Sequence, residues 1–258
     1  MVKNISIYGL VLAYLLLFVL IAVSFKEKLK LEKDVVVSFG RMSLQLFLAG
    51  FVLLWLFRVD KFYLNVVVLV GMVFFATRIV LKRANISYTG IAKYIFLSIL
   101  VSSLSVLSIV VFGIVGLSYP RASYLIPLAG MIIGNSMNST AIGIERFFST
   151  LNNSKEMVED LLCLGAMSEE AVDFVKQASL KASILPTLTS SSGMGVVFLP
   201  GMMTGQVLSG VNPENAVKYQ IAIVIAIAVA VCLTNYIMLK ILSKKSINFL
   251  FDRGYIKI

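Results

Sequence analysis

The chain has 258 residues, of which 59% are hydrophobic and only 14% are charged, and its mean hydropathy is +0.94. Soluble proteins carry about 25% charged residues, so this composition excludes a soluble globular protein and predicts several membrane spans of roughly 20 residues each. The net charge of +10 then indicates cytoplasmic loops beside anionic lipids, and no nucleic-acid partner is expected. The sequence has no His and only two Cys, which excludes the usual proton shuttle and a cysteine-rich metal cluster.

Apolar runs of membrane-spanning length occur at seven places in the chain. In chain order they are Ile5–Phe25, Val35–Phe57, Phe62–Leu81, Ile91–Leu117, Pro127–Ile144, Leu188–Leu208 and Val217–Leu242. We therefore expect an all-α, polytopic protein with about seven transmembrane helices, forming a single transmembrane domain over residues 1–258.

The positive charges are distributed unequally between the two sides of this arrangement. Of the 23 Lys and Arg residues, 17 fall on one side, five fall on the other, and Arg41 lies inside a span. Cytoplasmic loops carry the excess of Lys and Arg in membrane proteins. The sequence therefore predicts an N-terminus outside and a C-terminus in the cytoplasm.

The acidic residues concentrate in one cytoplasmic loop, about 145–187, between the fifth and sixth spans. This loop holds seven of the 13 acids, and Met157, Leu161 and Leu164 recur on one helical face. A second helix is expected to begin at Ser168, after a turn at Gly165. The two helices could lie on the membrane surface, but interfacial helices are usually rich in Lys and Arg, so an acidic pair favours a cytoplasmic protein partner.

Two segments in the predicted spans five and six share a pattern. Leu128–Asn135 and Leu199–Gln206 both read Leu, Ala or Pro, Gly, Met, two residues, Gly and an amide. Each contains the spacing Gly-x-x-x-Gly, which lets helix backbones approach closely. Close packing alone would explain the glycines, which are Gly130, Gly134, Gly201 and Gly205.

Polar side chains continue from the first of these segments, and they are too many for a helix that faces lipid. They must pair with other helices or face water. In the predicted sixth span Pro186 and Pro200 are expected to interrupt the helix and expose backbone carbonyls beside a cavity. Arg41 and Gln45, one turn apart in the second span, either belong to a site or place Arg41 to snorkel. The candidate residues of a translocation path are Arg41, Gln45, Met131, Asn135, Ser136, Asn138, Thr140, Met202, Met203, Thr204 and Gln206.

The chain lacks the residue sets that membrane-embedded or nucleotide-dependent enzymes need. It has no triad and no P-loop spacing of Gly-x-x-x-x-Gly-Lys-Ser/Thr. We therefore expect no enzyme activity and no cofactor bound by this chain, and ATP, if used, on a partner subunit.

Three segments together resemble the FetB-type iron-export permeases of ABC transporters: Ile126–Asn138 followed by Glu145-Arg146, Leu199–Gln206, and Lys218–Ile221. The resemblance covers essentially the whole chain in length and span order. It implies a permease subunit in the cell inner (plasma) membrane that exports a metal ion, with iron as the family's substrate. It also implies a cytoplasmic ABC ATPase subunit that carries ATP, and a permease homodimer.

The acidic loop is similar to the coupling signature of ABC permeases, Glu-Ala-Ala, three residues and Gly. Glu159 and Gly165 match this pattern, whereas Asp160-Leu161 replaces Ala-Ala and Leu185-Pro186 lies further on than expected. The residues that this similarity assigns to ATPase coupling are Glu145, Arg146, Glu159, Gly165, Glu169 and Glu170.

Two other functions stay open at the level of sequence. A stand-alone secondary transporter or channel would need ion ligands within the spans, but no carboxylate lies at mid-depth. An ABC permease for a non-metal substrate is the second alternative. The metal ligands are unknown, because Fe²⁺ sites favour His and carboxylate, whereas the path offers Met thioethers, amides and hydroxyls.

Overall fold

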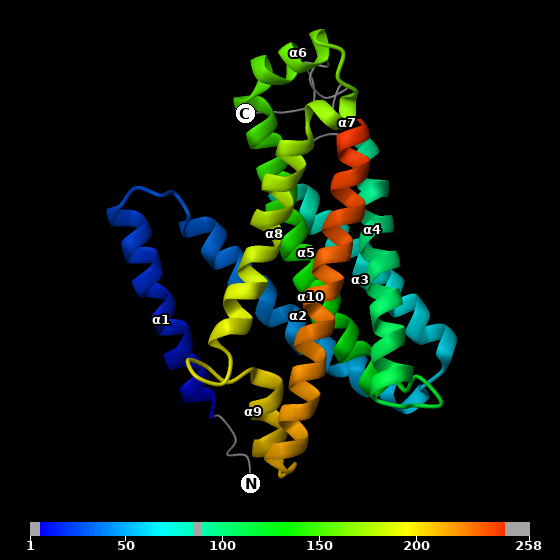
Figure 1. Ribbon diagram of the computed structural model, residues 1–258. Coiled ribbons are helices and arrows are strands. Elements are labelled where there is room, and N and C mark those ends of the chain that lie inside the picture. Colours follow the sequence, from blue (N-terminus) through cyan, green and yellow to red (C-terminus); the bar gives the residue numbers. More distant parts are fainter. Residues whose placement is uncertain (1–5, 85–88, 246–258) are drawn as a thin grey trace. The chain divides into compact units, whose positions relative to one another are not determined.

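The computed structural model describes residues 6–84 and 89–245, and this part of the chain is helical apart from its turns and one isolated β-bridge between Met194 and Phe198. The predicted all-α class is therefore confirmed. The elements are α1 (Ile7–Lys26), α2 (Glu32–Val59), α3 (Phe62–Arg83), α4 (Thr89–Ser108), the π-helix η1 (Ile109–Ile114), α5 (Ala122–Asn153), α6 (Lys155–Cys163), α7 (Ser168–Ala171), α8 (Asp173–Gly193), α9 (Gly201–Leu208) and α10 (Pro213–Lys244) (Figure 1).

The chain divides into two compact units, one built around α1 and α2 and the other around α3 to α10. In the first unit a polar cluster fixes the turn between the two helices. The Ser24 hydroxyl donates to Glu32 at 2.8 Å and accepts from the backbone N–H of Leu31 at 3.1 Å. Lys28 and Lys30 have φ values of 55° and 58°, so the turn needs the left-handed region twice within three residues.

Five of the described helical segments are long and apolar enough to cross a membrane. They are Ile7–Lys26, Glu32–Val59, Phe62–Arg83, Gly90–Ile114 and Pro213–Lys244, which correspond to predicted spans one, two, three, four and seven. Helices α5 and α8 do not meet that standard. The membrane location and the helical class are thus supported, and the count of seven and the positions of the termini stay predictions.

The predicted sixth span, Leu188–Leu208, is not one helix. Helix α8 ends at Gly193, an irregular segment follows, and α9 begins at Gly201. Pro186 does not interrupt the chain as predicted, because it lies inside α8. Proline removes only the hydrogen bond to the carbonyl four residues before it, here that of Ala182. Next to this point α8 packs against α5, where the Ser139 hydroxyl donates to the backbone carbonyl of Ser183 at 2.8 Å.

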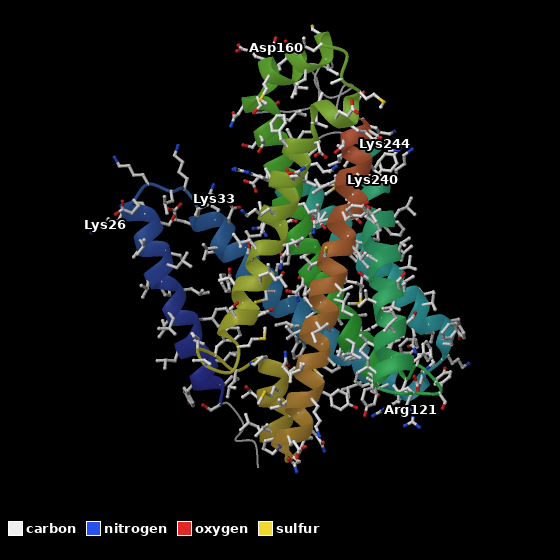
Figure 2. All side chains as sticks on the ribbon, in the orientation of Figure 1. Lys26, Lys33, Arg121, Asp160, Lys240 and Lys244 are labelled. Carbon is white, nitrogen blue, oxygen red and sulfur yellow. The ribbon has the colours of Figure 1, made fainter. Side chains whose placement is uncertain are left out.

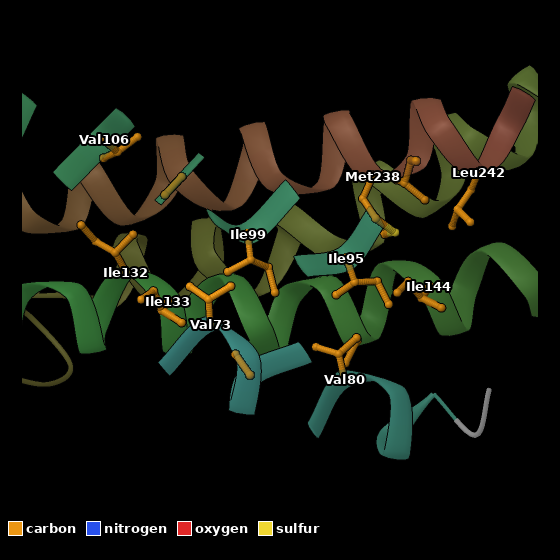
Figure 3. Packing of buried hydrophobic residues seen from close by; sticks show 14 of the residues in the cluster. Val73, Val80, Ile95, Ile99, Val106, Ile132, Ile133, Ile144, Met238 and Leu242 are labelled. Atoms are coloured by element: carbon orange, nitrogen blue, oxygen red, sulfur yellow. The ribbon is translucent and has the colours of Figure 1, made fainter. Parts of the chain in front are cut away.

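The apolar core of the second unit lies where α3, α4, α5 and α10 meet (Figure 3). Helix α5 buries residues at helical spacing, including Ile133, Ile144 and Leu151, and this periodicity puts them on one stripe. Against the stripe pack Val73 and Val80 of α3, Ile95 and Ile99 of α4, and Met238 and Leu242 of α10.

The charged residues that the sequence assigns to the cytoplasm gather at one end of the second unit. Figure 2 shows Asp160, Lys240 and Lys244 at this end and Arg121 at the opposite end. The Lys245 ammonium donates to the Tyr94 hydroxyl at 2.7 Å, so the end of α10 meets the start of α4. The grouping agrees with the predicted alternation of the helices. Lys3, Arg253 and Lys257, which enter the charge count, lie outside the described residues.

Candidate functional site

A polar cavity lies between α5, α8 and α10 in the second unit. Its volume is about 300 Å³. Its lining residues are Asn135, Asn138, Ser139 and Ile142 of α5, Ser183, Pro186, Thr187, Ser190 and Ser191 of α8, Met194 just after α8, and Gln220, Val224 and Ile227 of α10. No lining side chain carries a charge, and hydroxyls and amides supply the polar groups of the wall.

A buried hydrogen-bonded junction holds the three helices together at one edge of this cavity. The Asn235 side-chain nitrogen donates to Ser139 Oγ at 2.7 Å and to the Val231 carbonyl at 2.8 Å. Ser139 in turn donates to the Ser183 carbonyl. One polar chain thus joins α10, α5 and α8, and a buried Asn in an apolar helix needs such partners because lipid supplies none.

Gly143 makes this junction possible. A Cβ at Gly143 would lie 2.7 Å from Asn235 Oδ1 and 3.2 Å from Ser183 Cβ. A side chain of any size would therefore push α5 away from α8 and α10.

A second, more apolar pocket of about 380 Å³ adjoins the polar cavity. The two share Ser191, Met194, Gln220 and Val224. The apolar pocket adds Leu199 and Pro200, which lie between α8 and α9, and Met203 of α9. The irregular segment after α8 therefore borders the site, as the sequence pattern around Pro200 suggests.

The structure brings only some of the predicted path residues together. Asn135 and Asn138 line the polar cavity, and Met203 lines the apolar pocket. Ser136 and Thr140 are buried, and their hydroxyl oxygens have no hydrogen-bond partner in the part of the chain that the structure describes. None of these contacts shows a substrate, so the path itself stays a prediction.

The other predicted path residues lie elsewhere. Met131 and Met202 pack against the apolar core, the Thr204 hydroxyl donates to the Pro200 carbonyl at 3.0 Å, and Gln206 lies on α9. Arg41 and Gln45 lie on α2, in the first unit. They are one turn apart on the same helix.

Several residues of the cavity wall carried a sequence signal that did not identify them as a site. Gln220 of the wall and Asn235 of the neighbouring junction are amides in the 32-residue apolar helix α10, where an amide already indicates a partner. Ser183 and Thr187 give a weaker signal, because a serine or threonine hydroxyl can donate its hydrogen bond to a backbone carbonyl of its own helix. Only the packing of the three helices shows that they face the same space.

The four glycines of the repeated pattern do not make the expected close contacts within this chain. Among the described residues, and apart from the adjacent backbone of the same helix, no atom lies within 4 Å of a Cβ built at Gly134, Gly201 or Gly205, and Gly130 meets only the end of the Met72 side chain at 3.4 Å. Close backbone approach occurs at Gly143 instead. A role for the four glycines against a second copy of the chain stays a prediction.

The acidic loop contains the first predicted helix, α6, but with a different buried face. Val158 is fully buried, whereas Met157 is 54% exposed and Leu164 is 85% exposed. The predicted face of Met157, Leu161 and Leu164 is therefore wrong by about one position. Gly165 has a φ of +92°, so the turn after α6 uses the left-handed conformation that glycine adopts at no cost.

The second half of the loop is one turn of helix, α7, followed directly by the long helix α8. A helix begins at Ser168 as predicted, but it ends after one turn, and the residues from Asp173 onward are continuous with the helix that lines the cavity. Glu170 accepts from the backbone N–H of Met167 at 2.9 Å, so Met167 rather than Ser168 caps the turn. Glu169 forms an ion pair with Lys244 of α10 at 3.3 Å.

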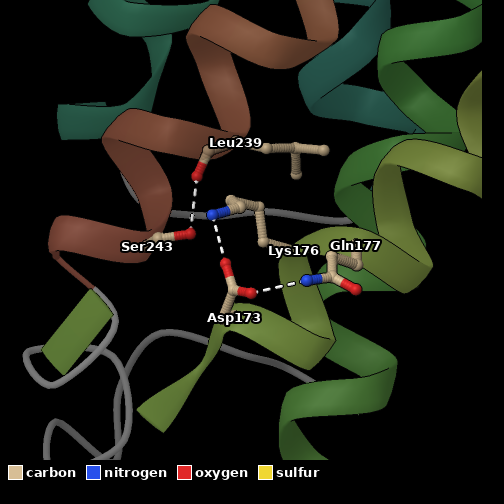
Figure 4. Close-up of polar contacts among 5 residues, drawn as sticks. All are labelled: Asp173, Lys176, Gln177, Leu239 and Ser243. Atoms are coloured by element: carbon tan, nitrogen blue, oxygen red, sulfur yellow. Dashed lines mark hydrogen bonds and ion pairs between the residues drawn. The ribbon is translucent and has the colours of Figure 1, made fainter. Parts of the chain in front are cut away.

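The first turn of α8 is fixed by polar contacts (Figure 4). Asp173 pairs with Lys176 and accepts from the Gln177 amide at 2.5 Å. The hydrogen bond from Lys176 is the main reason that the pKa of Asp173 lies below its ordinary value. Beside this turn Ser243 donates to the Leu239 carbonyl at 2.9 Å, near the end of α10.

The remaining coupling candidates are exposed at the same end. Glu145 and Arg146 lie on the surface of α5, and Glu159 pairs with Lys155 across one turn of α6 at 3.5 Å. Among the described residues there is no group of three or more His, Cys, Asp or Glu that could hold a metal ion.

A polytopic helical protein with a polar cavity between its helices has the architecture of a membrane permease. The chain belongs to the uncharacterised protein family UPF0014, whose profile matches residues 7–247. It is 32% identical to the probable iron export permease protein FetB of Escherichia coli over 95% of this chain and 93% of that protein. It is 34% identical to the membrane protein YjkA of Bacillus subtilis, over 88% of this chain and 90% of that one.

A plant protein is also similar. ALUMINUM SENSITIVE 3 of Arabidopsis thaliana is 32% identical over 81% of this chain and 76% of its own length. No solved structure gives a significant match to the chain. The family therefore supports a multi-pass membrane permease.

Proposed function

We propose that the chain is the permease subunit of an ABC transporter that exports a metal ion, with iron as the first candidate, and that ATP is hydrolysed on a separate cytoplasmic subunit. A homodimer of this chain would form the membrane part. The name of the Escherichia coli relative supports iron export. The observation that carries the ATPase partnership is the continuity between the acidic loop and the cavity wall.

The acidic loop is packed against the helix ends and continues into the cavity wall, so a movement of the loop reaches the cavity. Val158, Ala171 and Val175 are buried against the helix ends, and Glu169 is held to Lys244. The loop is thus a packed element and not a loose connection. From Asp173 the backbone runs as one helix to Gly193, and this helix carries Thr187 and Ser190 in the cavity wall. A displacement of the loop would therefore move one wall of the cavity.

The outer surface of the loop has the composition of a docking site. Leu164 and Met167 are strongly exposed on either side of Gly165, and Glu156, Glu159 and Asp160 precede them on α6. Exposed apolar side chains within an acidic rim are typical of protein interfaces. We propose that these apolar residues contact the ATPase. Glu169 and Glu170, which have partners inside the chain, would position the loop.

The test compares two exposed apolar residues at opposite ends of the second unit. Leu164→Asp changes the proposed interface, and Val211→Asp, at a position 42% exposed, is the matched control. Both variants are co-expressed with the cognate ATPase, and membrane insertion, co-purification of the ATPase and ATP-driven transport are measured. We expect Leu164→Asp to insert normally but to lose the ATPase and transport, while Val211→Asp keeps both.

Retention of ATPase binding and transport by Leu164→Asp would contradict the proposed interface. Metal transport by the purified chain in liposomes without any ATPase would replace the proposal by a stand-alone transporter.

A further inference from the structure

The polar cavity has a chemical character that bears on how a metal ion could occupy it. This inference rests on the proposed export of a metal ion. The wall consists of amides, hydroxyls, a thioether and apolar side chains, without a carboxylate or any other charged group. Sites that bind a bare divalent or transition-metal ion usually offer carboxylate, imidazole or thiolate ligands.

Three hydroxyls of the wall direct their hydrogens to backbone carbonyls. Ser139 donates to the Ser183 carbonyl, Ser183 donates to the Leu180 carbonyl, and Ser191 donates to the Thr187 carbonyl, each at 2.8 Å. A hydroxyl whose hydrogen is engaged can only accept a further hydrogen bond. These three side chains therefore present acceptor oxygens to the space between the helices.

The amides add to this excess of acceptors. The Asn135 nitrogen donates one of its two hydrogens to the Met131 carbonyl at 2.8 Å, and the Asn135 oxygen stays available as an acceptor. Gln220 Oε1 is buried and has no hydrogen-bond partner within the described residues, and Gln220 stands where the polar cavity meets the apolar pocket. A buried acceptor without a partner is costly unless a ligand or water donates to it.

An acceptor-rich, neutral wall suits water molecules around a cation better than the cation itself. Removal of water from a divalent ion is very costly, and neutral oxygens without a counter-charge recover little of that cost. Water bound to a cation points its hydrogens outward, and those hydrogens match the acceptors of the wall. A bridging water is nearly as favourable as a direct hydrogen bond.

The cavity is large enough for this arrangement. Its volume is about 300 Å³, and six water molecules at liquid density occupy roughly 180 Å³. An ion with an octahedral first shell of water therefore fits between α5, α8 and α10 without losing a ligand.

We propose that the cavity takes the divalent metal ion with its first shell of water intact, and that Gln220, Ser191 and the other acceptors of the wall bind this water instead of the metal. Recognition then depends on the charge and size of the hydrated ion. The softness of the metal, which orders the affinities of directly ligated ions, has little influence.

The test uses cobalt(III) hexaammine, an ion whose six ammine ligands exchange too slowly to be replaced by protein groups. The permease is reconstituted in liposomes with its ATPase, and ATP-driven transport of Fe²⁺ and Mn²⁺ is measured with and without the complex. We expect the complex to compete with both ions. We also expect the KM values of Fe²⁺ and Mn²⁺ to agree within about threefold, a smaller spread than direct ligation by soft groups would give.

Two substitutions at one position give opposite results in the same assay. Gln220→Leu removes an acceptor and is expected to weaken inhibition by the complex about fivefold. Gln220→Glu adds a charged acceptor and is expected to strengthen inhibition about tenfold. Leu188→Ala, on the exposed face of α8 outside the cavity, is the control for insertion and assembly.

The outcomes separate the two proposals. Transport of Fe²⁺ that is insensitive to cobalt(III) hexaammine, or equal inhibition of the two Gln220 variants, would contradict the hydrated-ion inference and leave metal export intact. Absence of any ATP-driven metal transport by the wild-type complex would contradict the proposed export and this inference with it.

Discussion

Helix α5 has one apolar face that packs in the core and one polar face that lines the cavity. One face buries Ile133 and Ile144 against α3 and α4, while the other presents Asn138 and Ser139 to α8 and α10. In a membrane an apolar side chain is as well solvated by lipid as by protein, so apolar contacts stabilise only through tight packing. A polar side chain has no partner in lipid. The polar face therefore determines which helices meet and where the cavity forms.

The largest expected effect comes from removing an aromatic anchor on the apolar face. Phe147 is fully buried near the end of α5, with its ring edge-to-face on Phe148 at a centroid distance of 5.7 Å. We expect Phe147→Ala to lower the free energy of unfolding by about 3–5 kcal/mol, measured by thermal unfolding in detergent. Phe112→Ala, at a position that is 51% exposed, is the control, and equal destabilisation of both variants would contradict the assigned core.

The next effect tests the close approach on the polar face. Gly143→Ala would force a Cβ against Asn235 and Ser183, and overpacking of this kind costs about 1–3 kcal/mol. Gly134→Ala lies on the same helix, where a Cβ meets nothing, and is expected to be neutral or slightly stabilising because alanine favours helix. If both variants unfold at the same temperature, α5 does not contact α8 and α10 as described.

A smaller effect tests the junction itself. Asn235→Ala removes the hydrogen bond to Ser139, and interhelical hydrogen bonds in membranes contribute about 0.6–2 kcal/mol. Because the same change removes the atom that a Cβ at Gly143 would strike, the double variant Gly143→Ala/Asn235→Ala is expected to be more stable than the sum of the single effects predicts. Strict additivity in a double-mutant cycle would contradict the contact.

The smallest effect concerns the first turn of α8, outside the apolar core and the cavity. The pKa of Asp173 in the folded protein lies below its ordinary value of 3.8, so its stabilising effect is present above that value and is lost as the pH falls through the lowered pKa. Asp173→Asn is expected to unfold with a weaker acid dependence below about pH 4. Identical pH profiles of the melting temperature for the two proteins would show that the contact with Lys176 does not stabilise the loop.

The sequence predicted the helical class and one wall of the cavity for a clear physical reason. Polar residues on an otherwise apolar helix need partners, and the run from Asn135 to Thr140 therefore marked α5. The opposite wall was not predictable in the same way. Which faces of α8 and α10 meet α5 depends on long-range packing, and nothing local distinguishes Thr187 from a hydroxyl that faces lipid.

Two errors show where local rules fail. Pro186 indicates a helix break in isolation, but proline removes only one backbone hydrogen bond, and α8 packs there against α5, where Ser139 donates to its backbone. The buried face of α6 was misplaced because Met157 and Val158 both fit a helical spacing. The neighbouring helix ends decide between them, and this leaves Met157 and Leu164 exposed for a partner.

Two adjacent residues of α8 test most directly whether substrate passes through the cavity between α5, α8 and α10. Thr187 lines the cavity, whereas Leu188 is 53% exposed on the other side of the helix. In liposomes containing the permease and its ATPase, Thr187→Trp should fill the cavity and abolish ATP-driven metal transport, while Leu188→Trp should transport at the wild-type rate. Transport by Thr187→Trp at the rate of Leu188→Trp would contradict passage of substrate through the cavity.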